Sequence, residues 1–186
     1  YRRNPQAANL PMGRGLSLPN HPRILVLETR MKLSAATLLL AVLGLTAICY
    51  GNSLNGAWCF DDLAIRMWIM HQLPAEAMRE FGISHRPLLW FTYWLNGRQG
   101  GVDQTFIYHA TNLLIHLLSV AVVFGICRKI LKSNEAAAAG AILFGIHPFF
   151  TSTVDYIDGR GSLLCAFFVL LSTWLLIGFN SWRKLP

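Results

Sequence analysis

The sequence predicts an all-α membrane protein with about four transmembrane helices and short interfacial helices in the first outer loop. Of the 186 residues, 54% are hydrophobic and only 13% are charged, a balance typical of membrane proteins. A helix needs about 20 apolar residues to cross a hydrocarbon core. Four stretches of about that length lack Asp, Glu, Lys and Arg: residues 33–50, 104–127, 136–154 and 161–182. Each is expected to be helical, because a spanning segment must satisfy its own backbone hydrogen bonds.

The first thirty residues differ from the rest of the chain. Residues 1–30 are polar, rich in Pro, Gly and Arg, and show no sustained periodicity, whereas Met31-Lys32 directly precedes the first apolar run. We interpret residues 1–30 as a disordered or mistranslated leader. Residues 31–186 are interpreted as the N-terminal part of a multi-pass membrane domain. The run 33–50 has no clear small-x-small cleavage site, which favours a retained signal-anchor helix over a cleaved signal peptide.

The distribution of charge predicts the orientation. Basic residues lie before the first apolar run, between the second and third, and after the fourth, while the loops 53–103 and 151–160 carry most of the acidic residues. The positive-inside rule then places both termini in the cytoplasm and the two acid-bearing loops on the opposite side. This placement accounts for the net charge of +7. Membrane lipids, and no nucleic acid, are therefore the expected surroundings.

The first outer loop, residues 53–103, is too long for a simple turn. It is rich in Trp, Phe and Tyr, which favour the headgroup region of a membrane. Residues 62–73 are expected to form a short amphipathic helix. Residues 86–96 are expected to form a second, with Pro87 at a favourable first-turn position. Both helices are expected to lie along the membrane surface.

Asp61 and Asp62 stand at the start of the first of these helices. An acidic pair at the surface of an otherwise apolar and basic membrane protein indicates chemistry on a charged, lipid-carried substrate. The alternative is a helix cap, since the dipole of a helix favours carboxylates at its N-terminus. Both interpretations stay open, and Asp61 and Asp62 are the candidate catalytic residues.

A polar stripe runs along the second apolar segment. His109, Asn112 and His116 recur at spacings of three and four residues, which places them on one face of a helix. Such residues face a water-filled cavity or form hydrogen bonds between helices. The second interpretation is preferred for His116, deep in the span. His109 and His147 lie nearer the outer surface and are candidates for a site. No spacing of His, Glu or Cys indicates a metal site.

Five motifs, taken in order, resemble one known family. From about residue 58 to residue 171 they are similar to the first part of the multi-pass O-mannosyltransferases that carry C-terminal tetratricopeptide repeats, and to their bacterial relatives. The motifs are Phe60-Asp61-Asp62, Arg86-Pro87-Leu88, Tyr108-His109-x-x-Asn112-x-x-x-His116, His147-Pro148-x-x-Thr151-x-x-Val154 and Gly159-Arg160-x-x-Leu163-Leu164. The chain departs from the family at Ser152, where an acidic residue is usual, and at Ser162, where a polar or acidic one is common. The later helices and any repeats of the family are expected to lie beyond this sequence.

The resemblance implies a truncated GT-C-like fold and a glycosyltransferase activity. Such an enzyme moves a sugar, with mannose as the first choice, from a polyprenyl-phosphate donor to a hydroxyl of a protein or glycan acceptor, such as Ser or Thr. It works on the periplasmic face of a bacterial inner membrane or the lumenal face of the endoplasmic reticulum. No cofactor is implied with certainty, and a divalent metal is left open. The fragment alone is expected to be inactive, because donor sites in such folds draw on later helices.

The resemblance also implies roles for particular residues. By analogy with acidic pairs in the GT-C group, Asp61 is expected to be the general base, with Asp62 orienting the acceptor or a supporting group. Guanidinium groups suit a lipid phosphate, so Arg160, and after it Arg86, are expected to bind the donor. Further substrate-binding candidates are His85, His109 and His147.

Two other classes stay open. One is a transporter or lipid-handling protein, in which the polar stripe of the second span lines a substrate path. The other is a non-catalytic membrane assembly subunit, in which the acidic pair only caps a helix. Neutralising either aspartate should then lower stability without affecting any transfer reaction.

Overall fold

The computed structural model describes residues 33–71 and 86–182, with side chains placed up to residue 179. His85 and residues 1–30, on which two of the expectations fall, lie outside the described residues. Within the described ranges the chain forms α-helices and short 3-10 helices and no strand. Three of its helices are long and apolar enough to cross a membrane, or four if one bent pair counts as a span. The predicted fold class, an all-α membrane protein, is therefore confirmed.

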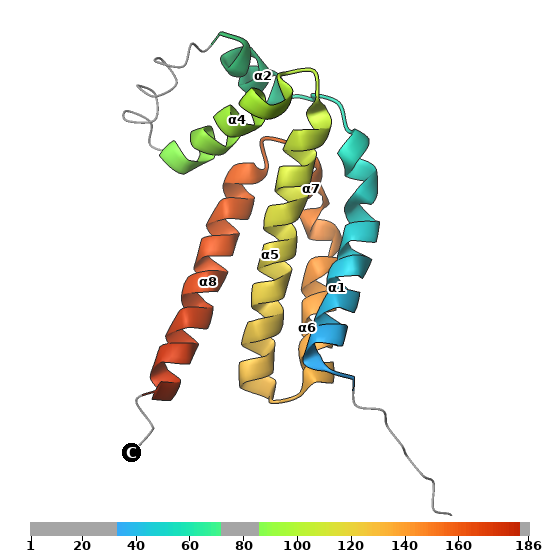
Figure 1. Ribbon diagram of the computed structural model, residues 1–186, viewed down its shortest axis with the longest axis vertical. Coiled ribbons are helices and arrows are strands. Elements are labelled where there is room, and N and C mark those ends of the chain that lie inside the picture. Colours follow the sequence, from blue (N-terminus) through green and yellow to red (C-terminus); the bar gives the residue numbers. More distant parts are fainter. Residues whose placement is uncertain (1–32, 72–85, 183–186) are drawn as a thin grey trace, which may run out of the picture. The chain divides into compact units, whose positions relative to one another are not determined.

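Four apolar helices form the main bundle (Figure 1). They are α1 (Ala35–Tyr50), α5 (Thr105–Leu131), α6 (Asn134–Gly145) and α8 (Arg160–Trp182). Helix α5 lies between α8 on one side and α6 with α1 on the other. Hydroxyl caps begin two of these helices: Ser34 accepts a hydrogen bond from the Thr37 amide, and Ser133 from the Ala136 amide. Such caps satisfy amide groups that have no partner within the first turn.

The third apolar run is not one straight helix, contrary to expectation for residues 136–154. Helix α6 ends at Gly145 and is followed by a 3-10 turn, η2 (Pro148–Phe150), and by α7 (Thr151–Asp155). The two parts meet at a bend of 43°. Proline has no amide hydrogen and disfavours helical backbone at the preceding residue, so the break falls at His147-Pro148.

Small residues allow α1, α5 and α6 to approach closely. A Cβ atom added to Gly145 would lie 2.6 Å from the Thr46 hydroxyl oxygen and 3.2 Å from a methyl carbon of Val120. Ala137 and Ala141 are also fully buried at this contact. Without a hydrophobic driving force in lipid, helices associate through such close packing. By contrast, a Cβ atom on Gly44 of α1 would meet nothing within 4 Å.

Two short helices, α2 (Asp62–His71) and α4 (Pro87–Gly100), lie across one end of the bundle (Figure 1). Trp68 of α2 packs on Trp90 of α4, with ring centroids 4.7 Å apart. The buried Tyr93 hydroxyl donates to the Ile157 carbonyl at 2.8 Å, and burial raises the pKa of this hydroxyl well above its ordinary value. The Trp58 indole donates to the Val102 carbonyl at 2.8 Å. The first contact joins α2 to α4, the second joins α4 to the connection that precedes α8, and the third joins the segments that precede α2 and α5.

Candidate functional site

The two aspartates of the acidic pair lie in different environments, one buried and one exposed. Asp62 is 1% exposed. One of its carboxylate oxygens accepts a hydrogen bond from the Asp158 amide at 2.7 Å, and the other accepts from the Cys59 amide at 3.4 Å. Asp61 is exposed. Phe60, just before the pair, has a left-handed backbone with φ of 49°, so the chain turns sharply there. Asp62 thus links the start of α2 to the connection before α8, while Asp61 faces outward.

Asp61 opens onto a cavity of about 390 Å³. Three carboxyl-bearing residues and three hydroxyl-bearing residues contribute to its wall. The complete lining is Cys59, Phe60, Asp61, Asp62, Ser152, Thr153, Tyr156, Asp158 and Gly159. Large, well-formed concavities with a few convergent polar groups are the usual places for small-molecule sites. This cavity is therefore the candidate functional site.

Asp158 is the residue of this site that sequence reasoning did not select. Its carboxyl is exposed and shares the cavity with Asp61. Partial burial raises the pKa of Asp158, the charges of Asp61 and Asp62 raise it further, and Arg86 lowers it. Ser152, where the family resemblance leads one to expect an acidic residue, lines the same cavity. The signal that could have found Asp158 was its place in the second acidic outer loop.

A second space adjoins the first. It is a groove of about 550 Å³ between the N-terminal ends of α4 and α8. Its lining is Arg86, Pro87, Leu88, Leu89, Asp158, Gly161, Ser162, Leu164, Cys165 and Phe168. The charged residues lie at the end where α8 begins. Phe168 lies about two turns further along that helix, or about 12 Å at 1.5 Å per residue. The groove thus combines a charged end with an apolar wall.

Arg160, the first choice for phosphate binding, is turned into the protein. It is 0% exposed. Its guanidinium donates to the Asn112 side-chain oxygen at 2.8 Å, to the Tyr108 carbonyl at 2.9 Å and to the Thr92 hydroxyl at 3.2 Å. It also lies 4.4 Å from the centre of the Tyr93 ring, a cation–π distance. This geometry favours a structural part for Arg160 and leaves Arg86 as the arginine that lines an open space.

The polar stripe of α5 mainly connects helices. Asn112 donates to the Tyr156 carbonyl at 2.8 Å and accepts from Arg160. The ring Nε2 of His116 forms a 2.9 Å hydrogen bond with the Gly145 carbonyl of α6. The preferred interpretation of His116, a hydrogen bond between helices, is confirmed.

The two histidines nearer the outer surface line neither space. His109 is 1% exposed, and its ring lies so close to Gly56 that a Cβ atom there would be 2.7 Å from Nε2. Within the described part of the chain no hydrogen bond of ordinary geometry reaches a ring nitrogen of His109, although the Gly56 backbone lies against the ring, and one oxygen of Asp155 also has no partner. His147 is exposed, and its Nδ1 accepts from the Phe149 amide at 3.2 Å, which caps η2.

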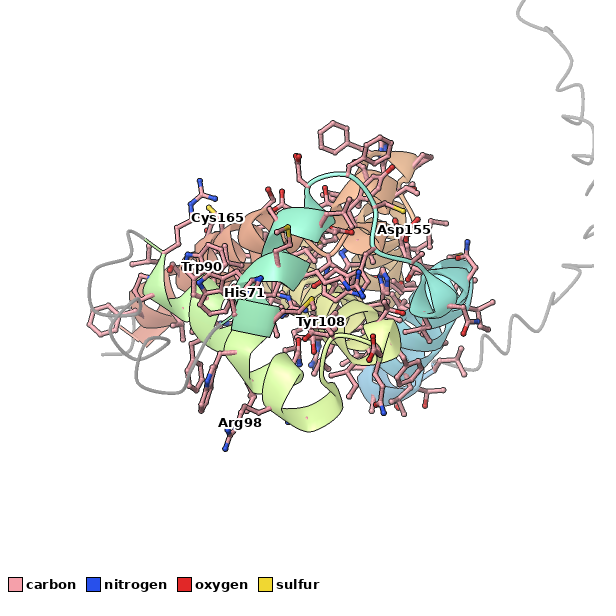
Figure 2. All side chains as sticks on the ribbon, turned by 90° about the horizontal axis from the view of Figure 1, so that it is seen from above. His71, Trp90, Arg98, Tyr108, Asp155 and Cys165 are labelled. Carbon is pink, nitrogen blue, oxygen red and sulfur yellow. The ribbon has the colours of Figure 1, made fainter. Side chains whose placement is uncertain are left out.

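Figure 2 looks onto the end of the bundle that carries the site. Tyr108 lies near the middle of this view, while Arg98 points outward from the C-terminal part of α4. Among residues 33–71 and 86–179, no three His, Cys, Asp or Glu side chains are grouped so that they could hold a metal ion. The polar groups that the structure does bring together are the carboxylates and hydroxyls of the cavity and the guanidinium of the groove.

Several curated proteins share part of this sequence. Protein O-mannosyl-transferase TMTC1 of Homo sapiens is 31% identical over 147 residues, which cover 69% of this chain and 16% of that protein. Protein O-mannosyl-transferase TMTC4 of Homo sapiens is 28% identical over 164 residues, or 72% of this chain and 22% of that protein. TMTC3 of Homo sapiens is 26% identical over 144 residues, with 69% and 16% covered.

The chain therefore spans less than a quarter of the length of these relatives. No family profile matches it, and no solved structure does. The resemblance inferred from five motifs is confirmed: over about 69% of its length, this chain is a homologue of part of the TMTC protein O-mannosyl-transferases.

Proposed function

We propose that this chain is the N-terminal part of a membrane-embedded glycosyltransferase. It transfers a sugar, with mannose as the first choice, from a polyprenyl-phosphate donor to a hydroxyl group such as that of a protein Ser or Thr. The names of the homologues support transfer of mannose to protein. The single observation that carries the proposal is the cavity in which the exposed Asp61 stands beside the anchored Asp62.

Asp61 is the proposed general base. An acceptor hydroxyl in the cavity gives its proton to the Asp61 carboxylate as its oxygen attacks the anomeric carbon of the sugar. The bond between that carbon and the phosphate oxygen breaks at the same time, and the phosphate leaves with the electron pair. Attack from the side opposite the phosphate inverts the anomeric centre. Holding both substrates in this alignment supplies much of the rate.

Asp62 and Arg160 are proposed to position the site rather than to contact substrate. Both are buried and are hydrogen-bonded to other parts of the chain. Arg86 is the proposed contact for the lipid phosphate, because it lines the open groove and because guanidinium binds phosphate oxygens in pairs. His109 and His147 line neither the cavity nor the groove, so we assign them no direct contact with substrate.

The proposed orientation places the cavity on the periplasmic or lumenal side, with residues 31–32 and the end of α8 in the cytoplasm. The flanking basic residues support it: Arg128 and Lys129 lie in the last turn of α5, at the end of the bundle opposite α2 and α4. Basic residues favour cytoplasmic loops. The membrane is a bacterial inner membrane or the endoplasmic reticulum.

The decisive experiment uses the complete reading frame that contains this chain, expressed in membranes supplied with polyprenyl-phosphate mannose. Sugar transfer to protein is compared for the parent, Asp61→Asn and Asp62→Asn at matched amounts of inserted protein. Asp103→Asn is the control, because this carboxylate is 89% exposed and contacts only Arg66, at 3.8 Å, among the ion pairs of the described residues.

We expect Asp61→Asn to lose transfer by about 100-fold or more, with normal insertion and a thermal stability no lower than that of the parent. Asp62→Asn should lower stability as well as transfer, and Asp103→Asn should change neither. Full transfer by Asp61→Asn would remove the proposed base. Absence of transfer from the parent with any lipid-linked sugar would favour the assembly subunit, the class that the structural role of Asp62 also fits.

A further inference from the structure

Asp158 is the residue that the cavity and the groove share. The cavity that contains Asp61 and the groove that contains Arg86 both include Asp158 in their walls. The two spaces otherwise have different linings, one rich in carboxyl and hydroxyl groups and the other mostly apolar. Asp158 therefore stands at the boundary between them.

The geometry of the proposed displacement places the reacting sugar at this boundary. In an in-line displacement the attacking oxygen, the anomeric carbon and the departing oxygen lie along one line. If the acceptor hydroxyl is at Asp61 and the phosphate is at Arg86, the anomeric carbon must lie between the cavity and the groove. The sugar ring is then placed against the residue that borders both spaces. A carboxylate in that position accepts strong hydrogen bonds from sugar hydroxyls.

Asp158 is also well held for such a contact. Its backbone amide donates to the buried Asp62 carboxylate at 2.7 Å, so the main chain is fixed while the side chain is exposed. Two residues further on, Arg160 is locked by its bonds to Asn112 and Tyr108. The connection that carries Asp158 is thus anchored on both sides of its side chain.

We propose that Asp158 contacts the donor sugar and selects it, by accepting a hydrogen bond from the 2-hydroxyl, the hydroxyl next to the anomeric carbon. The inference rests on the proposed function and deepens it, because it names the residue that recognises the sugar. Arg86 contacts the phosphate on one side of this residue, and Asp61 activates the acceptor on the other.

The test pairs a variant with a donor analogue. The complete reading frame is assayed with polyprenyl-phosphate mannose and with its 2-deoxy analogue, for the parent, Asp158→Asn and the control Asp103→Asn. Each kcat/KM ratio between the two donors is compared with the parent ratio, so that the intrinsic reactivity of the deoxy sugar cancels. Losing a charge-assisted hydrogen bond lowers kcat/KM by roughly 10- to 100-fold.

The expected result is that Asp158→Asn loses about that factor with mannose and little with the 2-deoxy donor, so its discrimination between the donors falls. Asp103→Asn should keep the parent ratio. A ratio equal to that of the parent, with or without an equal loss for both donors, would overturn the role of Asp158 and leave the proposed transferase activity in place. No transfer by the parent from either donor would instead overturn the proposed function, and this inference with it.

The variant should fold, because the tie to Asp62 uses the Asp158 amide and not its carboxylate. Thermal unfolding of Asp158→Asn, compared with the parent, checks this directly. A loss of folding would be met with Asp158→Glu, which keeps the charge. If the carboxylate recognises the 2-hydroxyl, Asp158→Glu should keep part of the preference for the mannose donor over the 2-deoxy donor. Asp158→Ala serves as its reference, and an equal preference in Asp158→Glu and Asp158→Ala would contradict the inference.

Discussion

Replacing Arg160 by methionine tests whether this arginine, the most buried charged residue in the described part of the chain, stabilises the fold. Methionine fills similar apolar space but donates no hydrogen bond. The Asn112 oxygen, which accepts from Arg160 at 2.8 Å, then loses its partner inside the protein. Leaving a buried acceptor without a partner costs about 1–3 kcal/mol. Loss of the desolvated contact with the Tyr93 ring adds about 2 kcal/mol. The free energy of unfolding should therefore fall by about 3–5 kcal/mol.

Arg98→Met is the matched control. Arg98 is exposed, points away from the bundle and lies 5.8 Å from the centre of the Trp94 ring. An exposed contact of this kind is worth about 0.5–1 kcal/mol. Both variants replace an arginine by methionine, Arg98 at an exposed position of α4 and Arg160 at a buried position at the start of α8.

The assay is equilibrium unfolding of the purified proteins in mild-detergent micelles, with a denaturing detergent as the titrant. Arg160→Met should unfold at a clearly lower fraction of the denaturing detergent than Arg98→Met. Equal stability of the two variants, to within about 1 kcal/mol, would refute the structural role derived from the hydrogen bonds. Arg160 would then return as a candidate for phosphate binding.

Three further predictions concern packing, charge and orientation. Gly145→Ala should lower the free energy of unfolding by about 1–3 kcal/mol because a methyl group there overpacks the helix contact, whereas Gly44→Ala should change it by less than about 1 kcal/mol; a similar effect of both would contradict the close approach. The raised pKa of Asp158 means that its contribution to stability is fully present below the unfolded value of 3.8 and is lost as the pH rises through the folded value. Asp158→Asn or Asp61→Asn should thus raise the melting temperature relative to the parent at pH 7 and not at pH 3.5. Equal shifts at both pH values would argue against repulsion between the carboxylates of Asp61 and Asp158. Cys59 is exposed and should react with a membrane-impermeant maleimide only from the periplasmic or lumenal side; labelling from the cytoplasmic side would reverse the proposed orientation.

Hydrophobic length predicted the helices of the bundle well. A run of about 20 residues without charge has few stable alternatives to a helix in a membrane. The same criterion hid the break between α6 and α7, because Pro148 lies inside the apolar run and does not shorten it. Proline alone was not decisive, since transmembrane helices tolerate it when neighbouring groups satisfy the freed backbone. Helix α7 packs against α1, α5 and α8, and hydropathy does not measure such contacts between distant segments.

The residues of the site were harder to predict than the helices. Adjacent aspartates look alike in a sequence, yet the partner of Asp62 is an amide 96 positions further along the chain. Likewise, the family resemblance led us to expect that Arg160 binds the phosphate of a lipid-linked donor. Arg160 is instead buried because Asn112 and the aromatic rings of Tyr93 and Tyr108 close around it. Both outcomes depend on tertiary contacts that no local pattern encodes.

The site shows a division between residues that hold and residues that act. Asp62 and Arg160 are buried. The hydrogen bond of Asp62 ties the connection between α7 and α8 to the start of α2 at Asp158, and that of Arg160 ties the start of α8 to α5 at Asn112. Asp61 and Asp158 are exposed and face the cavity from the two segments so joined. Groups that must bind and release substrate cannot also be committed to internal bonds, whereas groups that set geometry must be. A variant at either buried residue should therefore disturb both exposed carboxylates together, while a variant at either exposed one should leave its neighbour in place.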